Sequence, residues 1–302
     1  MLITALADVE PRSRKVAVGE FDGVHLGHRE VIRGNDTVLT FEPHPLAVVR
    51  PEATPRLLTD LARKAELMAR LGVQELAVIP FDQGFAHQSP QEFIDHILVE
   101  RLQATHVSVG DNFRFGHRAA GDVEMLRADA RFQTRVVPLV EVEGEIVSSS
   151  HIRGLLLAGE VDVAARFLGA PFQLSGIVVS GDRRGRELGF PTANIVPEEA
   201  MVYPGHGVYA ALADDACAAV SIGVRPTFHT GRAPLVEAYL IDREVDLYGQ
   251  TLRLDFLMRL RGERRFDSAQ ALIEQMADDV RRTREICAAR RETAPDESEL
   301  RG

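Results

Sequence analysis

The chain has 302 residues, of which 45% are hydrophobic and 26% are charged, and its formal net charge is −10. This composition is typical of a globular protein, and the length suits two hydrophobic cores better than one. The acidic balance argues against a nucleic-acid partner, which would need a basic face, but a few local donors can still hold a single nucleotide.

The first half of the chain alternates short apolar runs with helical patterns. Apolar residues three or four positions apart predict helices over Leu57–Leu71 and Pro90–Leu102. Strands that alternate with helices predict a mainly parallel sheet covered on both faces, that is, a Rossmann-like α/β domain. The runs that predict its strands are Lys15–Val18, Thr37–Phe41, Leu76–Pro80, His106–Val109 and Arg135–Leu139.

The pattern changes near residue 170, after short predicted helices over Ile152–Gly169. Consecutive strands separated by turn residues, with one long helix at Ser268–Cys287, predict an antiparallel β-barrel with a terminal helix. These strands are Leu174–Ser180, Gly207–Ala213, Ala216–Ile222, Leu235–Ile241 and Leu252–Met258. We expect one domain over 1–155, linker helices over 156–172, a second domain over 173–290 and a disordered polar tail over 291–302.

The segment Gly19–His28, reading GEFDGVHLGH, follows the first predicted strand and opens a helical pattern. It stands at the carboxyl end of a parallel strand, where ligands bind, and its three glycines permit close approach of the backbone. His25 and His28 are three positions apart, so on a starting helix they point to the same side and suit phosphate oxygens. Alone, the pair could also be half of a metal site or an unremarkable surface pair, although zinc would need a further ligand.

This string resembles the signature of the nucleotidyltransferase superfamily, whose members transfer a nucleotidyl group from a nucleoside triphosphate and release pyrophosphate. A second signature of these enzymes, a serine-rich run ending in Ile-Arg, is present at 148–153. The resemblance implies catalytic roles for His25, His28 and Arg153, and a guanidinium can bind phosphate oxygens bidentately. The ATP-binding residues that it implies in this domain are Gly19, Phe21, Asp22, His25, Gly27, His28, Ser148, Ser149, Ser150 and Arg153.

Two further strings, TFEPHP at 40–45 and GDNFRFG at 110–116, are similar to flavin-side motifs of the bacterial FMN adenylyltransferase module. Each taken alone would be an ordinary loop. The flavin-binding residues that the resemblance implies are Pro43, His44, Asn112, Phe113 and Phe115. The chain departs from the family in one respect: only Arg29–Asp36 is available for the first helix, which therefore covers less of one sheet face.

The second half carries a glycine-bounded turn at 181–185 and the string LGFPTAN at 188–194. Such turns can wrap backbone N–H groups around phosphates. Thr192 and Asn194 are two positions apart, so in an extended chain they face the same side. Their oxygens suit Mg²⁺, which keeps several waters and shares nucleotide phosphates. In isolation, a Pro-Thr turn with capping side chains would explain the string better.

This half resembles the riboflavin kinase family in PTAN at 191–194, SIGVRPTF at 221–228 and DLYG at 246–249. The resemblance implies that Glu237, in the string VEAY, is the general base for the riboflavin hydroxyl, although an isolated strand glutamate would more simply be a solvent-facing charge. It also implies Mg²⁺ at Thr192 and Asn194. The ATP-binding residues that it implies here are Gly181, Gly185, Arg186, Gly189, Pro191, Thr192 and Asn194.

Over residues 14–288 the chain is similar to the bifunctional bacterial riboflavin kinase/FMN adenylyltransferases, also called FAD synthetases. The resemblance implies phosphorylation of riboflavin to FMN and adenylylation of FMN to FAD, each with ATP. One alternative is a riboflavin kinase whose adenylyltransferase half is impaired by the short helix. Another is a non-catalytic flavin or nucleotide sensor, which would not need the base Glu237.

Two features bear on location. No run of about 18 apolar residues occurs, so no membrane span is expected. Cys217 and Cys287 lie far apart without metal-like spacing, which favours a reducing compartment. We expect a cytoplasmic protein that is a monomer or a weak homo-oligomer.

Overall fold

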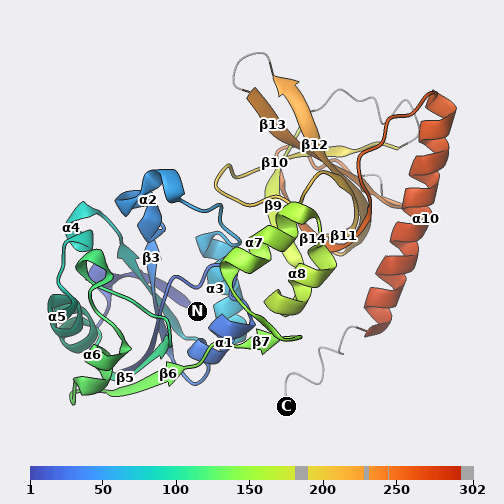
Figure 1. Cartoon of the computed structure of the whole chain (residues 1–302). Coiled ribbons are helices and arrows are strands. Elements are labelled where there is room, and N and C mark those ends of the chain that lie inside the picture. The colour runs from blue at the N-terminus through green and yellow to red at the C-terminus, as the bar shows by residue number, and fades with distance from the viewer. Residues whose placement is uncertain (181–189, 228–230, 244, 294–302) are drawn as a thin grey trace. The chain divides into compact units, whose positions relative to one another are not determined.

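The computed structural model describes residues 1–180, 190–227, 231–243 and 245–293 (Figure 1). The chain divides into two units, Met1–Ser149 and Ser150–Gly302. Gly181, Gly185, Arg186 and Gly189 lie outside the described residues, and so do residues 294–302. In the described part, no helix combines the length and the apolar character needed to cross a bilayer.

The first unit is built on a six-stranded sheet in the order β1-β4-β3-β2-β5-β6, with every neighbouring pair parallel. This confirms the predicted Rossmann-like layer. The first strand was not predicted, because its four residues at the sheet edge leave most side chains exposed. The strands are β1 Leu2–Ala5, β2 Arg14–Val18, β3 Thr37–Glu42, β4 Glu75–Pro80, β5 Ala104–Gly110 and β6 Gln133–Val137.

Helices cover both faces of this sheet (Figure 1). One buried cluster joins α1 and α3 to one face, and a second joins η3 and α6 to the other. The helices are α1 Leu26–Ile32, α2 Pro45–Val49, α3 Leu61–Arg70, α4 Gln83–Ala86, α5 Pro90–Glu92, the π-helix η3 Phe93–Arg101 and α6 Val123–Ala128, with 3-10 turns η1 Leu6–Asp8, η2 Pro51–Ala53 and η4 His117–Ala119. The short hairpin β7 Glu141–Val142 and β8 Glu145–Ile146 follows the sheet.

The first helix α1 is short, as expected, but its seven residues are Leu26–Ile32 and do not fall within Arg29–Asp36, because the helix starts directly after its N-cap His25, inside the motif. Val31 and Ile32 are buried in the same cluster as Met68 of α3. The guanidinium of Arg135 on β6 donates to the carbonyls of Arg33 and Glu30, which ties the end of α1 to the sheet. The end of this short helix is therefore packed against α3 and tied to the sheet.

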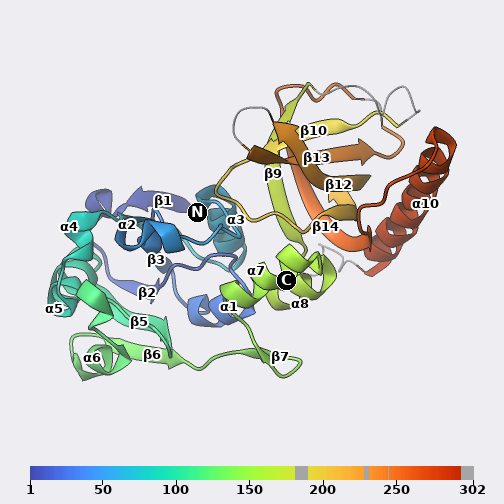
Figure 2. The same ribbon diagram turned by 45° about the horizontal axis from the view of Figure 1, so that its top comes forward.

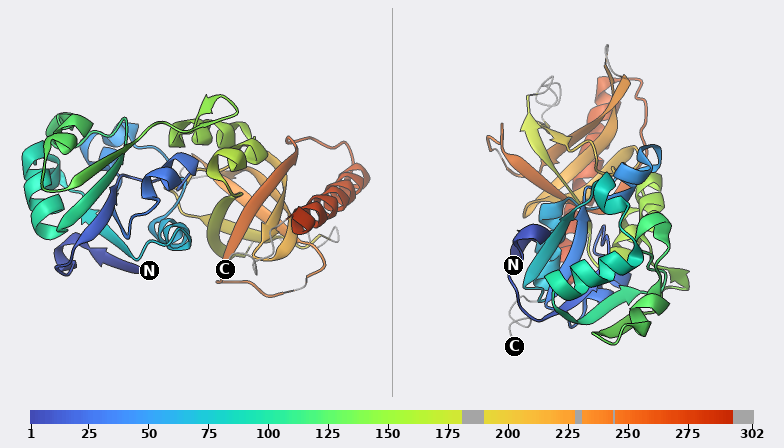
Figure 3. Two further views of the ribbon diagram at one scale, coloured as in Figure 1. Left: turned by 90° about the horizontal axis from the view of Figure 1, so that it is seen from below. Right: turned by 90° about the vertical axis from the view of Figure 1, so that its left-hand side faces the viewer.

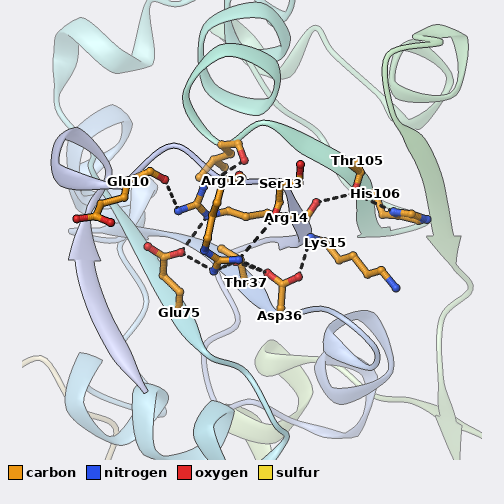
Figure 4. Close-up of polar contacts among 11 residues, drawn as sticks. Glu10, Arg12, Ser13, Arg14, Lys15, Asp36, Thr37, Glu75, Thr105 and His106 are labelled. Atoms are coloured by element: carbon orange, nitrogen blue, oxygen red, sulfur yellow. Dashed lines mark hydrogen bonds and ion pairs between the residues drawn. The ribbon is translucent and has the colours of Figure 1, made fainter.

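The amino ends of four strands meet in a buried ionic network (Figure 4). Arg14, only 1% exposed, donates from Nε to Glu75 Oε2 at 2.9 Å, and Arg12 donates to the same oxygen at 2.9 Å. Arg14 also donates to the carbonyl of Glu10 at 2.7 Å, and Arg12 pairs with Asp36 at 3.3 Å. This end of the sheet thus uses its charges to hold strands together.

Helix α7, Ser149–Ala158, leads into the second unit, which continues with α8 Val161–Leu168 and a closed antiparallel barrel in the order β10-β13-β12-β11-β14-β9 (Figure 2). This confirms the predicted barrel. The short strand β10 was not predicted, because it starts inside the PTAN string and ends at a proline. The strands are β9 Phe172–Val179, β10 Ala193–Pro197, β11 Gly207–Ala213, β12 Ala216–Thr227, β13 Gly231–Leu240 and β14 Thr251–Arg261.

The terminal helix α10, Ala269–Thr293, packs against β11, β12 and β14 of the barrel (Figure 3). A bidentate ion pair holds the helix in place. The guanidinium of Arg261 on β14 donates to both carboxylate oxygens of the buried Asp279, and its two contacts with Oδ2 measure 3.0 and 2.8 Å. Thr283 and Cys287, on the same helix face, are also buried. The helix therefore closes one side of the barrel wall.

Candidate active sites

The order of the sheet marks one place in the first unit. Strands β3 and β4 follow β2 to one side, whereas β5 and β6 lie to the other, so the strand order reverses between β2 and β5. Ligands of open parallel sheets bind outside the carboxyl ends of the strands at such a switch point. The loop that leaves β2 at this point is the GEFDGVHLGH segment.

The two histidines of this loop lie face to face. His25 is the N-cap of α1, and its Nδ1 accepts a hydrogen bond from the backbone N–H of His28 at 3.2 Å. The rings stack with centroids 3.5 Å apart and an interplanar angle of 17°, and Phe21 meets His28 edge-on at 5.3 Å. A Cβ at Gly27 would lie 3.3 Å from the His25 ring, so this glycine leaves room for the stack. The predicted same-side arrangement is confirmed.

Because Nδ1 of His25 accepts, the neutral ring carries its proton on Nε2. His25 is 5% exposed, so this tautomer is fixed by its surroundings. His25 can thus offer an Nε2–H donor to an anion.

Asp22 and Ser149 fix the loop itself. The Asp22 carboxylate, 2% exposed, accepts from the backbone N–H groups of Leu58 and Thr59 at 2.9 and 3.0 Å. These bonds hold Leu58 and Thr59 outside the helix, so α3 begins at Leu61 and not at Leu57 as predicted. The Ser149 hydroxyl donates to the carbonyl of Asp22 at 2.9 Å, which joins the second signature to the first.

The other residues of the second signature follow on the chain. Ser148 precedes Ser149, and Ser150 and Arg153 belong to α7 in the second unit. Their position opposite the histidines stays a prediction, as do the phosphate contacts of Gly19 and Asp22.

A buried lysine lies beside the loop and was not predicted. Lys64 of α3, 3% exposed, donates from Nζ to the carbonyl of Glu20 at 2.7 Å and to its Oε1 at 3.2 Å. Thr40 accepts at 3.4 Å. Burial raises the pKa of the Glu20 carboxyl from 4.5 to about 7. The ion pair with Lys64 lowers this pKa, whereas the nearby carboxylates of Asp22 and Glu42 raise it further. Glu20 occupies a variable letter of the motif, which gives no sequence signal.

An aromatic pocket of about 670 Å³ opens near the carboxyl ends of β3 and β4. Of the predicted flavin residues, Phe115 lines it, and Phe113 stacks on Phe115 with centroids 5.6 Å apart. His44 caps α2, whose first residues also line the pocket. Pro43 and Asn112 are not among the lining residues. The side chains that sequence reasoning missed here include Phe41, Phe81, Phe85, Phe93, His87, His117, Arg114 and Arg118.

A signal for several of these missed residues was present in the sequence. Residues 81–88 follow the carboxyl end of β4 directly, just as the histidine loop follows β2. Applying the strand-end rule to every strand would have included Phe81, Phe85 and His87.

In the barrel, register brings the predicted kinase residues together. Asn194 of β10 is the direct cross-strand partner of Glu237 of β13. Val236 and Ala238 are fully buried on the inner side, so the alternation of the strand turns Glu237 to the outer face together with Asn194. Direct partners of antiparallel strands have Cβ atoms about 4.5–5.5 Å apart.

The amide oxygen of Asn194 is the unusual atom of this group. The residue is 8% exposed, and its buried Oδ1 has no hydrogen-bond partner within the described residues. A buried oxygen of this kind calls for a ligand, since leaving it unpaired costs about 1–3 kcal/mol. No group of three or more His, Cys, Asp or Glu side chains in the described part could hold a metal. An amide oxygen beside a hydroxyl, with remaining positions left to water and phosphate, suits Mg²⁺.

A second pocket, of about 450 Å³, lies at the start of β10. It joins Pro191 and Thr192 of the PTAN string to Asp246, Leu247 and Tyr248 of the DLYG string. Two sequence motifs that are more than 50 positions apart in the chain thus line one cavity. Arg243 also lines it and was not predicted.

Comparisons with known proteins agree with this division. Residues 8–151 match the FAD synthetase family, and residues 168–287 match the riboflavin kinase family. A bifunctional riboflavin kinase/FMN adenylyltransferase of Listeria monocytogenes is 36% identical over 295 residues, covering 91% of this chain and 93% of that protein. The protein of the same name from Escherichia coli K12 is 36% identical, covering 90% and 92%.

A solved structure is also similar. The crystal structure of a protein named as a macrolide-efflux protein from Streptococcus pneumoniae has a TM-score of 0.86 and 30% identity, covering 94% of this chain and 99% of that one. With matches to both family domains and relatives at 36% identity over most of its length, this chain belongs to the bifunctional riboflavin kinase/FMN adenylyltransferase family.

Proposed function

We propose that the chain phosphorylates riboflavin to FMN in its barrel unit and adenylylates FMN to FAD in its first unit, consuming ATP in each step. The observation that carries the proposal is the cross-strand pairing of Asn194 with Glu237. It places an amide oxygen that can bind a metal beside a carboxylate, on one face of two neighbouring strands. Family membership supports the same assignment.

In the barrel, Glu237 accepts the proton of the riboflavin 5′-hydroxyl while that oxygen attacks the γ-phosphorus of ATP, and ADP leaves. Thr192 and Asn194 would hold Mg²⁺, which would supply positive charge to neutralise the phosphates. The fit rests on the buried Oδ1 of Asn194, which has no hydrogen-bond partner among the residues that the structure describes. The ATP contacts of Gly181, Gly185, Arg186 and Gly189 remain part of the proposal.

In the first unit, the FMN phosphate attacks the α-phosphorus of a second ATP, FAD forms and pyrophosphate leaves. The stacked pair His25 and His28 stabilises the charge that builds on the leaving pyrophosphate, together with Ser149, Ser150 and Arg153. No covalent intermediate on the protein is needed, so positioning and electrostatics supply the acceleration. The tight packing of α1 supports a working domain and counts against the impaired-domain alternative.

The aromatic pocket beside this site is our candidate for the FMN ring system. Its phenylalanine side chains offer flat apolar surfaces, and its volume suits a ligand of that size. Phe115 is the predicted flavin residue that lines it, and Pro43, His44, Asn112 and Phe113 are proposed to shape its surroundings.

The setting is proposed as well. Neither Cys217 nor Cys287 forms a disulfide, which suits the cytoplasm, where ATP is available. We propose a monomer or weak homo-oligomer that acts there.

One time course tests the function. The full chain is incubated with riboflavin, ATP and Mg²⁺, and riboflavin, FMN and FAD are separated by chromatography. We expect FMN to rise first and FAD to follow. Accumulation of FMN alone would remove the adenylyltransferase half of the proposal. Binding of FMN without any turnover of riboflavin would favour a sensor.

A further inference from the structure

The loop between β13 and β14 brings a positive charge into the barrel pocket. Arg243 lines the cavity that also contains Thr192 and Tyr248, and it is the single cationic side chain among the described lining residues. Its guanidinium has no hydrogen-bond or ion-pair partner within the part of the chain that the structure describes. Its five N–H donors are therefore available to a ligand.

The acid of the same pocket is already engaged. Asp246 Oδ1 accepts a hydrogen bond from the backbone N–H of Tyr248 at 3.2 Å, and the Asp246 carbonyl accepts from Gln250 at 3.0 Å. The N–H of Gly249 donates to the carbonyl of Val178 at 2.9 Å, which ties this turn to β9. The Asp246 carboxylate thus shapes its own turn, and the charge of Arg243 stays unneutralised by it.

The residues before Arg243 are fixed to the barrel and to the terminal helix. The N–H of Ile241 donates to the carbonyl of Cys217 at 2.8 Å, and Ile241 is buried. Asp242 adopts a positive φ of 60°, which aspartate tolerates better than most residues. Its carboxylate pairs with Arg284 of α10 at 2.6 Å. These contacts set the direction in which the chain enters position 243.

We propose that Arg243 binds the phosphate chain of ATP during riboflavin phosphorylation, and that Arg284 is a positioning residue that acts through Asp242. The inference rests on the proposed kinase function of the barrel. Thr192 and Arg243 line the same cavity, so phosphates on a metal held by Thr192 would be next to Arg243. A planar guanidinium can contact two phosphate oxygens at once and stabilise charge in the transferring group.

Replacement of Arg243 tests the contact. Arg243→Met keeps the aliphatic length of the side chain but removes its charge. Because a charge-assisted hydrogen bond contributes strongly to the binding free energy, we expect kcat/KM for ATP to fall about 10- to 100-fold. The sum of FMN and FAD formed counts every phosphorylation event. We expect the KM for riboflavin to stay within twofold, and Arg243→Lys to recover part of the loss. An effect on the riboflavin KM alone would assign Arg243 to the flavin and overturn the proposal.

Coupling tests the positioning role. Asp242→Asn keeps a residue that tolerates positive φ, and Arg284→Gln removes the other half of the pair. Because the pair is exposed, we expect each change to lower kcat/KM for ATP only about two- to fivefold. In the Arg243→Met background the same changes should have no further effect. A full additional loss in that background would mean that the pair acts structurally and not through Arg243.

The matched control is Arg253→Met, which breaks the exposed Arg253–Asp214 pair at a barrel position outside the pocket lining. It should leave FMN formation unchanged. If the wild-type chain forms no FMN, the proposed kinase function fails. If the wild type and Arg253→Met form FMN and Arg243→Met does so within twofold of them, the inference about Arg243 alone is wrong.

Discussion

The two units prepare for phosphate in different ways. In the first unit the candidate site is a loop at strand ends, and Phe21 and Val24 in that loop adopt positive φ of 53° and 42°. Such values are uncommon for side chains of this size, and buried anchors such as Asp22 hold the loop in place. In the barrel, Asn194 and Glu237 sit on regular strands and are aligned by register.

The two sites should therefore be sensitive to different kinds of substitution. A strand register changes only if a whole ladder slips, so a conservative change at Glu237 should remove its chemistry and nothing else. A strained loop depends on many supports, so residues that touch no substrate can still matter.

Glu237→Gln should have the largest effect. It keeps the shape of the side chain but removes the base, and loss of general base catalysis lowers rates about 10²- to 10⁴-fold. We expect that loss in FMN formation from riboflavin, with FAD formation from supplied FMN unchanged. Both rates are measured by chromatography on the same preparation. A kinase rate near that of the wild type would remove Glu237 from its proposed role.

His28→Ala should produce the reverse pattern. Removing one positioned donor from a charge-stabilising site costs about 10²- to 10³-fold. FAD formation from FMN should fall by that amount, while FMN formation from riboflavin persists. His106→Ala, at the amino end of β5 in the same sheet, is the matched control and should leave both rates intact. Equal loss of both activities in His28→Ala would contradict separate sites.

Much of this architecture could be predicted from the sequence, and the successes share a cause. Alternation of apolar runs with helical spacing gave the parallel sheet, and consecutive strands gave the barrel. The helix near Leu57 was placed too early, because periodicity does not reveal that the distant Asp22 captures the N–H groups of Leu58 and Thr59. A hydrogen bond to a residue far away in the chain leaves no pattern in the local sequence.

The same limit applies to the sites. The pairing of His25 and His28 could be predicted from their spacing alone, because residues three positions apart lie on the same side of a helix. The neighbouring of Asn194 and Glu237 depends on a register across 43 positions, which resemblance suggested and spacing could not. Lys64 and Arg243 were missed because each reaches its site from outside the motifs, and only tertiary packing brings it there.

Arg14→Ala tests whether the units differ in stability. Breaking a buried ion pair costs about 3–5 kcal/mol, but Arg12 remains bonded to Glu75, so we expect the free energy of unfolding of the first unit to fall by about 2–3 kcal/mol. FAD formation should then be lost on heating before FMN formation. Arg12→Ala is the control, since this residue is 39% exposed and its removal should cost at most about 1 kcal/mol. Simultaneous loss of both activities would show that the units unfold together.

The smallest effect is expected at Glu20, which lies half-buried beside the histidine loop. Burial raises its pKa to about 7, so the folded chain favours the protonated carboxyl. The resulting contribution to stability is fully present below pH 4.5 and is lost as the pH rises through 7. Glu20→Gln removes this titration and keeps an oxygen for Lys64. Allowing for the partly exposed side chain, we expect the variant to gain about 1–2 kcal/mol relative to the wild type between pH 5 and pH 8.

Denaturant unfolding of both proteins at several pH values measures that difference. A gain that appears only at the alkaline end assigns it to the carboxylate, because a general packing effect would be the same at every pH. If Glu20→Gln instead loses stability as the pH rises, the ion pair with Lys64 outweighs burial, and the carboxylate is a support of the strained loop that works when charged. The barrel, whose site needs no such support, should show no change in its own unfolding in either case.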